Sequence, residues 1–338
     1  MQSNKKGNSR FLGVLALVFC LVPAAPVMAE PPSLGLPIDC EIGRTCWLVN
    51  FVDRDPGPGV QDFRCGTLSY NSHRGVDFAI RDAGVMAAGV QVLAAASGTV
   101  RATRDGVPAS TLRDIEVRSR LSGRECGNGV VIDHADGWST QYCHLKANSL
   151  LVHRGDRVEK GQPLGEVGQS GLSEFPHVHV TVRQGDAVID PFTGETNIAA
   201  CSPDAKVAGL WAPDLQPLLP YPGPQPYHLG FHNGAPDIQD VRNGALTADR
   251  FKATAPALVF WAEVFSVAAG DRIRLTVNGP DAEVLHRDAV VDRPLARWFG
   301  FAGKKRTGEA WPTGTYEGVI EVARGSDLTR RNIFVTVE

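Results

Sequence analysis

Four histidines and one aspartate occupy short motifs that could bind and use a metal ion. His73 precedes Asp77 by four residues, His177 and His179 flank one valine, and His144 lies between these two motifs. Imidazole nitrogen and carboxylate oxygen are ligands of Zn²⁺, and a catalytic zinc site uses three protein ligands and leaves a fourth position to water. The set exceeds what one zinc ion requires, so some histidines remain for proton transfer.

Residues 174–182 must position two of these imidazoles, and their alternating pattern predicts a β-strand. One face would carry Val178, Val180 and Val182, and the other His177, His179 and Thr181. Thr181 and Arg183 continue the face that carries the two histidines, so we expect them to line a groove beside the site. His144 lies on a second alternating run, where Tyr142 would share its face; for Tyr142 we favour packing over a role at the substrate oxygen. His134, at a strand end beside a turn, is interpreted as structural.

The wider pattern predicts an all-β fold. Short alternating runs separated by glycine-containing turns indicate an antiparallel sheet, since no helical stripe of ten residues interrupts them. The runs are residues 76–80, 90–95, 99–102, 129–134, 139–145, 163–167 and 175–182. The charged segment 104–124 is expected to be a surface excursion near the groove.

The motifs together resemble a known family. His73-x-x-x-Asp77, Tyr142-x-His144-Leu145 and His177-x-His179, in this order, are similar to the lysostaphin-type zinc endopeptidases, which cut peptidoglycan peptides. The match continues through Gly127-Asn128-Gly129, Gly155-Asp156 and Gly168-Gln169-Ser170-Gly171, and it covers about residues 66–191.

The resemblance implies roles for the five residues. His73, Asp77 and His179 would hold one Zn²⁺ ion per chain, with water in the open position. His144 and His177 would stay off the metal as acid/base and transition-state groups. The implied substrate is a peptide bond in peptidoglycan, in a cross-link or a stem peptide.

The N-terminus has the pattern of a secretory signal. Lys5, Lys6 and Arg10 precede the apolar run 11–22, and a small residue, Ala29, marks the expected cleavage site. Twelve apolar residues are too few for a bilayer span, which needs about 20. Without the signal, 31 basic residues stand against 37 acidic ones, so we predict no nucleic-acid partner. From the signal pattern we expect a periplasmic or secreted protein.

Cysteine use agrees with export. Six cysteines remain after residue 29, and an even number in an exported chain suggests three disulfides, although 15 pairings are open. The pairings we favour are Cys40 with Cys46, Cys65 with Cys201, and Cys126 with Cys143. The last conflicts with a simple hairpin register about Asp136-Gly137, which would oppose Cys143 to Val130. Zinc binding by cysteines is the alternative, but no Cys-x-x-Cys pair exists.

Composition divides the 338 residues into five parts. A signal peptide (1–29) and a loop-rich, disulfide-tied segment (30–70) precede the zinc metallopeptidase domain (71–200). A proline-rich linker (201–228) leads to a small immunoglobulin-like β-sandwich (229–338), predicted from strands at 257–265, 273–277, 316–322 and 333–337. Trp261, Trp298 and Trp311 are better explained as core residues than as a carbohydrate platform.

Three functions compete. The first is an exported zinc metalloendopeptidase acting on peptidoglycan. The second is a regulator or binding protein of wall hydrolases on the same scaffold, either non-catalytic or with a site occluded by the N-terminal loops; no ligand of the motif set is missing, which favours catalysis. The third gives the leading role to the sandwich, as a module for a wall or protein partner.

Overall fold

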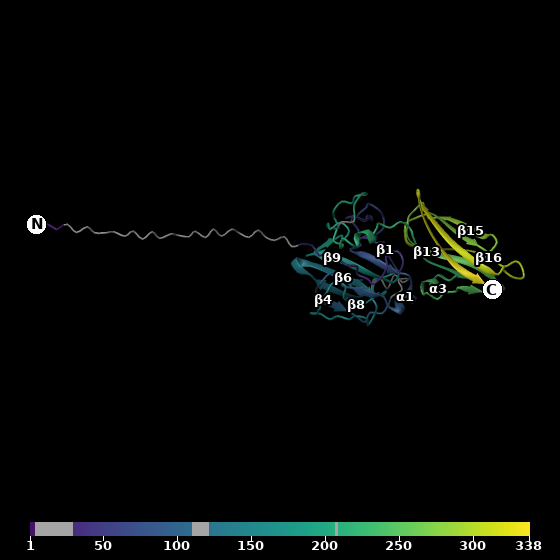
Figure 1. Ribbon diagram of the computed structural model, residues 1–338, viewed down its shortest axis with the longest axis horizontal. Helices are drawn as coiled ribbons and strands as arrows, with labels where there is room; N and C mark the ends of the chain where they lie inside the picture. The colour runs from purple at the N-terminus through teal and green to yellow at the C-terminus, as the bar shows by residue number, and fades with distance from the viewer. Residues whose placement is uncertain (4–29, 110–121, 207–208) are drawn as a thin grey trace. The chain divides into compact units, whose positions relative to one another are not determined.

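The computed structural model describes residues 1–3, 30–109, 122–206 and 209–338. The expected signal peptide and most of the expected surface excursion therefore lie outside the described residues. Antiparallel strands dominate, as predicted (Figure 1). Among the pairs of labelled strands that the described residues form, β12 with β18 is parallel.

An eight-stranded sheet carries the motif residues. Its order is β1-β2-β9-β6-β5-β4-β7, with β10 paired to β9. The strands are β1 (Cys46–Asn50), β2 (Val76–Ile80), β4 (Gly98–Arg104), β5 (Asn128–Asp133), β6 (Trp138–Leu145), β7 (Arg157–Val158), β9 (His177–Gln184) and β10 (Ala187–Ile189). The central strands β2, β9 and β6 are therefore neighbours although they are far apart in the sequence, which brings the three motifs together.

Smaller elements complete this part of the chain. A two-stranded sheet pairs β3 (Gln91–Leu93) with β8 (Pro163–Glu166). Helix α1 (Ala83–Ala88) begins where the Asp82 side chain accepts a hydrogen bond from the Val85 amide. The valines of β9 and Tyr142 of β6 point into one apolar core with Val130 of β5.

The β5–β6 hairpin differs from the simple register by one residue. A 3₁₀ turn, η1 (Ala135–Gly137), connects the two strands of the hairpin, and Asp136 and Gly137 both have positive φ. Gly129 consequently opposes Cys143, and Val130 opposes Tyr142. A shift of the strand pairing by one residue changes which side chains share a face of the sheet. The pairing of Cys126 with Cys143 therefore no longer conflicts with the hairpin register. All three favoured disulfides, Cys40–Cys46, Cys65–Cys201 and Cys126–Cys143, are confirmed.

The segments on either side of the motif region pack against it. Strand β1 forms the edge of the large sheet beside β2, and Phe51 and Phe63 are buried in the same core. In the proline-rich segment, Trp211 and Leu219 are buried there too, and the short 3₁₀ turn η2 (Gln216–Leu218) lies between them. The Leu34 amide donates to the Leu210 carbonyl at 2.7 Å. Much of the expected linker is thus part of a folded unit.

The C-terminal part is a two-sheet sandwich around its own core. One sheet is β11 (Gln225–His232), β13 (Ala257–Val267) and β16 (Leu295–Lys305). The other is β12 (Arg250–Phe251), β18 (Asp327–Val337), β17 (Gly314–Arg324), β14 (Arg272–Asn278) and β15 (Glu283–Val290). Helix α3 (Ile238–Arg242) lies between β11 and β12 in the sequence. Trp261 and Trp311 are buried, as a core role requires, and Trp298 is partly buried against the same core.

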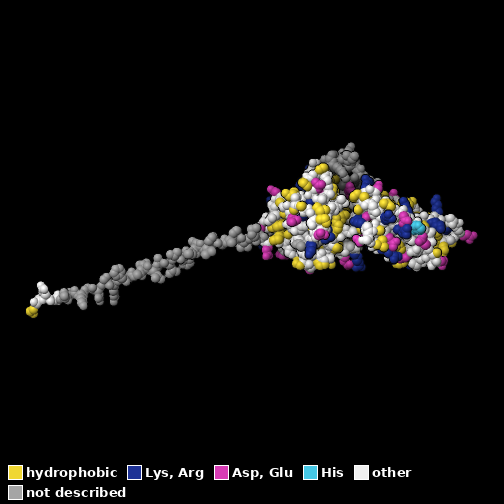
Figure 2. Space-filling view, turned by 90° about the horizontal axis from the view of Figure 1, so that it is seen from above, with side chains coloured by type: hydrophobic (Ala, Val, Ile, Leu, Met, Phe, Trp, Pro, Cys, Tyr) yellow, Lys and Arg dark blue, Asp and Glu magenta, His cyan; other side chains and the backbone are white. Residues whose placement is uncertain are grey.

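Surface charge is mixed on the face shown in Figure 2, where Lys and Arg side chains lie among Asp and Glu side chains. Among the residues that the structure describes, we find no helix with the length and apolarity that a membrane crossing needs.

Candidate metal centre

Strand pairing brings the three expected metal ligands together. Asp77 of β2 lies directly opposite His179 of β9, and His73 lies three residues before β2. Asp77 Oδ1 is 2.9 Å from His179 Nδ1 and 3.1 Å from His73 Nε2, and the two imidazole nitrogens are 3.0 Å apart. In a tetrahedral zinc site with bonds of about 2.0–2.1 Å, ligand atoms lie roughly 3.3 Å apart. The triangle therefore fits Zn²⁺ closely.

A second layer of hydrogen bonds turns each ligand atom toward the centre of this triangle. His73 Nδ1 lies 2.7 Å from the Phe51 carbonyl oxygen, to which it donates, so Nε2 is left without a proton. His179 Nε2 lies 3.0 Å from Thr181 Oγ1, which leaves Nδ1 for the metal. Such partners fix the tautomer and orientation of metal-binding histidines.

Asp77 is oriented by Asn50, a residue that the motif analysis missed. The Asn50 amide donates to Asp77 Oδ2 at 2.8 Å, and both side chains are buried. Asn50 is paired with Asp77 across a β-bulge at the end of β1. With Oδ2 engaged by Asn50, Oδ1 is the oxygen that faces the two imidazoles.

Electrostatics keep the carboxylate charged. Burial acts to raise the pKa of Asp77, but the charges of His73 and His177 and hydrogen bonds from His179 and His73 hold it well below its usual range. Burial lowers the pKa of His179, and Asp77 offsets this only in part. For His73, the charge and hydrogen bond of Asp77 outweigh burial and raise the pKa. An anionic oxygen and a neutral imidazole are the forms that a metal ion binds.

His144 reaches this centre because β6 contains a bulge. Asn128 opposes Leu145 and Gly129 opposes Cys143, so His144 is an extra residue, with φ of 66°. Regular alternation would have sent its side chain into the core with Tyr142. Instead its ring lies 4.6 Å from that of His177 and 5.9 Å from that of His179, between centroids.

The hydrogen bond of one ring nitrogen of His144 leaves the other one available to accept a proton. Nδ1 lies 2.8 Å from the Ser170 carbonyl oxygen, to which it donates, so Nε2 carries the lone pair. Burial, followed by the neighbouring His177 and His179, holds the pKa of His144 well below its ordinary value. A neutral imidazole with an available Nε2 can accept a proton at neutral pH.

His177 belongs to β9, which pairs with β2 on the side away from β1. Its Nδ1 is 2.8 Å from the Phe175 carbonyl oxygen and 3.2 Å from Ser173 Oγ. Its Nε2 is 3.6 Å from Asp77 Oδ1, beyond the distance of the other two histidines. His177 thus borders the triangle. Among the described residues, the group whose atoms lie close enough together to hold a metal ion consists of His73, Asp77 and His179.

The two tyrosines considered near the site have different surroundings. Tyr142 is fully buried, and its hydroxyl accepts from the Ala95 amide at 2.7 Å, so it packs in the core as favoured. Tyr70, three residues before His73, was missed; its ring lies 4.3 Å from the His73 ring. Partial burial and the charges of Asp77 and Glu174 raise the pKa of Tyr70, so its hydroxyl stays a donor.

His134 is structural, as expected. Its two ring nitrogens lie 2.8 Å from the Ser97 carbonyl oxygen and 2.9 Å from Thr140 Oγ1. Both partners belong to the far side of the sheet from the ligand triangle, where Thr140 also bonds the Tyr142 hydroxyl.

A pocket of about 380 Å³ opens beside the triangle. This volume falls within the usual range for small-ligand sites. Three groups of residues line it: Asn50, Ser69 and Tyr70 from the N-terminal segment, Asp77 and His177 with the loop Leu172–Phe175, and Ala296 of β16. One wall therefore comes from the C-terminal sandwich.

Comparison with known proteins finds one family model that matches this region. Residues 71–191 match the model of Peptidase family M23. The chain is 30% identical over 112 residues to the peptidoglycan DD-endopeptidase ShyA of Vibrio cholerae, covering 33% of this chain and 26% of ShyA. It is 38% identical over 99 residues to the DD-carboxypeptidase/endopeptidase Mpg of Neisseria meningitidis, covering 29% of this chain and 20% of Mpg. The chain thus spans about a quarter or less of these relatives.

A solved structure is also similar to this region. It is the catalytic domain of the antimicrobial peptidase lysostaphin from Staphylococcus simulans, at 23% identity and a TM-score of 0.27, covering 42% of this chain and 85% of that one.

Proposed function

Because residues 71–191 match the model of Peptidase family M23, we propose that the protein is an exported zinc metalloendopeptidase that hydrolyses peptide bonds of peptidoglycan. The observation that carries the proposal is the convergence of His73 Nε2, Asp77 Oδ1 and His179 Nδ1 within 3.1 Å of one another. The two further imidazoles beside them, His144 and His177, supply proton-transfer groups.

The three converging atoms are the metal ligands in this proposal. Zn²⁺ held by them would lower the pKa of a coordinated water toward ~7 and polarise the scissile carbonyl. One carboxylate and two neutral imidazoles leave a net positive charge to oppose a developing oxyanion.

His144 is the general base. Its Nδ1 is engaged by Ser170, so Nε2 takes the proton of the attacking water and later returns one to the leaving amine. His177, with Nδ1 engaged by Phe175, presents Nε2 to the same space as a second proton-transfer and stabilising group. Tyr70 donates its hydroxyl to the substrate oxygen from the pocket wall.

Peptidoglycan peptides are the substrate class that the relatives support, since ShyA is named a peptidoglycan DD-endopeptidase and Mpg a DD-carboxypeptidase/endopeptidase. Export follows from the signal pattern at residues 1–29 and agrees with three disulfides. The sandwich at 229–338 would serve a wall or protein partner as well as the pocket.

The competing proposal is a regulator that activates other wall hydrolases without cutting. The complete ligand triangle and the open pocket beside it favour catalysis, because a non-catalytic scaffold has no need of either.

The test is a muropeptide profile of purified peptidoglycan after incubation with zinc-loaded residues 30–338, with His144→Ala as the matched control. We expect new fragments from the parent and at least about 100-fold fewer from His144→Ala, and the fragment masses identify the bond. Stoichiometric zinc with no fragments from either protein would refute the peptidase and favour the regulator.

A further inference from the structure

The backbone of His144 has an unfavourable conformation. Its φ of 66° lies in the left-handed region, which residues with a Cβ atom seldom adopt. Such a residue persists only where its surroundings determine its position. The contacts that hold His144 in the bulge are therefore part of the catalytic arrangement.

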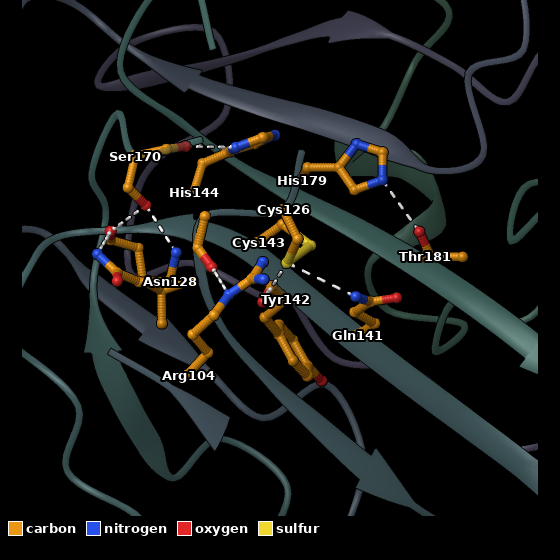
Figure 3. The surroundings of a disulfide bond; sticks show 12 residues. Arg104, Cys126, Asn128, Gln141, Tyr142, Cys143, His144, Ser170, His179 and Thr181 are labelled. Atoms are coloured by element: carbon orange, nitrogen blue, oxygen red, sulfur yellow. Dashed lines mark hydrogen bonds between the residues drawn. A yellow bond between two sulfur atoms is a disulfide. The ribbon is translucent and has the colours of Figure 1, made fainter. Parts of the chain in front are cut away.

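Two short segments make these contacts. The His144 amide donates to the Cys126 carbonyl at 2.8 Å, and its ring donates to the Ser170 carbonyl. Ser170 Oγ in turn donates to the Leu145 carbonyl at 2.8 Å and accepts from the Asn128 amide at 2.9 Å. Figure 3 shows His144 and Asn128 meeting at Ser170.

The two segments touch through glycines. A Cβ on Gly127 would lie 2.4 Å from the Ser170 carbonyl carbon, and one on Gly171 would lie 2.3 Å from the Glu125 carbonyl oxygen. The Leu172 amide also donates to Glu125 at 2.8 Å. A displacement of residues 125–128 would therefore move both partners of His144 together.

One covalent bond fixes residues 125–128 to β6. Cys126 is bonded to Cys143, the residue directly before His144. The disulfide lies on the ligand side of the sheet, because Cys143 is paired with His179 (Figure 3). The same cysteine thus supplies the carbonyl that accepts the His144 amide and the sulfur that anchors the chain beside it.

We propose that the Cys126–Cys143 disulfide is a positioning element for the general base, which holds His144 in its bulge above the metal centre. The expected loss of turnover rests on the proposed function, whereas the expected release of His144 from its position does not. The ligand side chains make their hydrogen bonds to residues other than the two cysteines, although the His179 backbone is the ladder partner of Cys143. We therefore expect the disulfide to act on proton transfer while the three ligand atoms stay together.

The structural test needs no activity. In metal-free residues 30–338, amide hydrogen exchange is followed by NMR for the parent and for Cys126→Ala/Cys143→Ala. We expect the His144 amide to exchange at least tenfold faster in the variant, with the Val178 and Val180 amides unchanged. The matched control is Cys40→Ala/Cys46→Ala, which removes another short-loop disulfide and should leave His144 unaffected. Unchanged exchange at His144 would overturn the proposal.

The kinetic test is a double-mutant cycle. The cysteine double variant should lose about 10- to 100-fold in kcat, with KM and bound zinc unchanged, and should lose less than about twofold more in a His144→Ala background. An equal loss in both backgrounds would show that the disulfide acts through general stability and would refute the proposal. If the double variant does not fold, Cys126→Ser is measured in the same cycle with the same expected pattern.

Discussion

The guanidinium of Arg297 lies over the ring of Phe175, 5.3 Å from its centroid. Arg297 belongs to β16 of the sandwich, and it also donates to the Glu174 carbonyl at 3.2 Å. Glu174 and Phe175 line the pocket beside the metal centre. The C-terminal part of the chain thus supports a loop that contacts substrate in our proposal.

Replacing Arg297 should weaken substrate binding without removing zinc. A cation–π contact contributes about 0.5–2 kcal/mol, which corresponds to a roughly two- to thirty-fold change in affinity. Arg297→Ala should therefore raise KM within that range while bound zinc stays the same. The control is Arg293→Ala, at an exposed position four residues earlier on the chain. Equal KM values for both variants would contradict a role for β16 at the pocket.

Loss of the Asn50 amide should reduce metal affinity. Removing a group that orients a metal ligand typically costs 10- to 100-fold in affinity, and Asn50 is the partner of Asp77 Oδ2. Asn50→Ala should raise the zinc dissociation constant by about that factor, as measured by competition with a chelator of known affinity. Asn71→Ala, at an exposed position near His73, should leave the constant unchanged. Parent-like affinity in Asn50→Ala would rule out the orienting role.

The proposed division of the five motif residues into three metal ligands and two proton-transfer groups has a direct consequence for metal content. Asp77→Ala and His179→Ala each remove an atom of the ligand triangle, so both should lose bound zinc after dialysis. His144→Ala and His177→Ala should retain zinc and lose turnover, because their free nitrogens lie beside the triangle. Metal analysis on all four variants checks this, and equal zinc loss in the four would overturn the division.

The acid limb of activity should lie below pH 6.5. Histidine ordinarily titrates near 6.5, and burial with the nearby His177 and His179 holds the pKa of His144 well below that value. The base form of His144 therefore persists as pH falls from 7.5 to 6.5. In the zinc-saturated protein, where protons reach the ligand nitrogens only after the metal leaves, activity declines only at lower pH. A pH profile of kcat/KM tests this. A half-maximal point above 6.5, or a flat profile down to pH 4, would contradict it.

The motif residues could be identified from sequence because strand alternation and motif order both involve neighbouring positions. Residues 174–182 alternate between an apolar and a polar face, and β9 has this arrangement. The pairing of Asp77 with His179 joins positions 102 residues apart. Alternation within one strand carries no information about its partner, so the distances in the triangle could not be foreseen.

Asn50 was missed because β1 does not alternate. All five of its residues are buried, since Leu48 packs in the large core and Trp47 packs with Tyr227 and Phe265 of the sandwich. A strand covered on both faces loses the period of two that reveals strands in a sequence. The sequence pattern also predicted the wrong face of the sheet for the His144 side chain, for a different reason. A bulge inserts one residue and reverses the alternation after Cys143.

The Cys65–Cys201 bond closes a covalent ring, because it joins residues 136 positions apart on either side of the motif region. All five motif residues lie inside this ring. A protease that cut the exposed turn at Arg154-Gly155 would break the backbone once but release no fragment, since both ends would stay tethered through the sulfur atoms. In an environment where other hydrolases act, a nicked molecule would keep its ligands and its base on one connected chain.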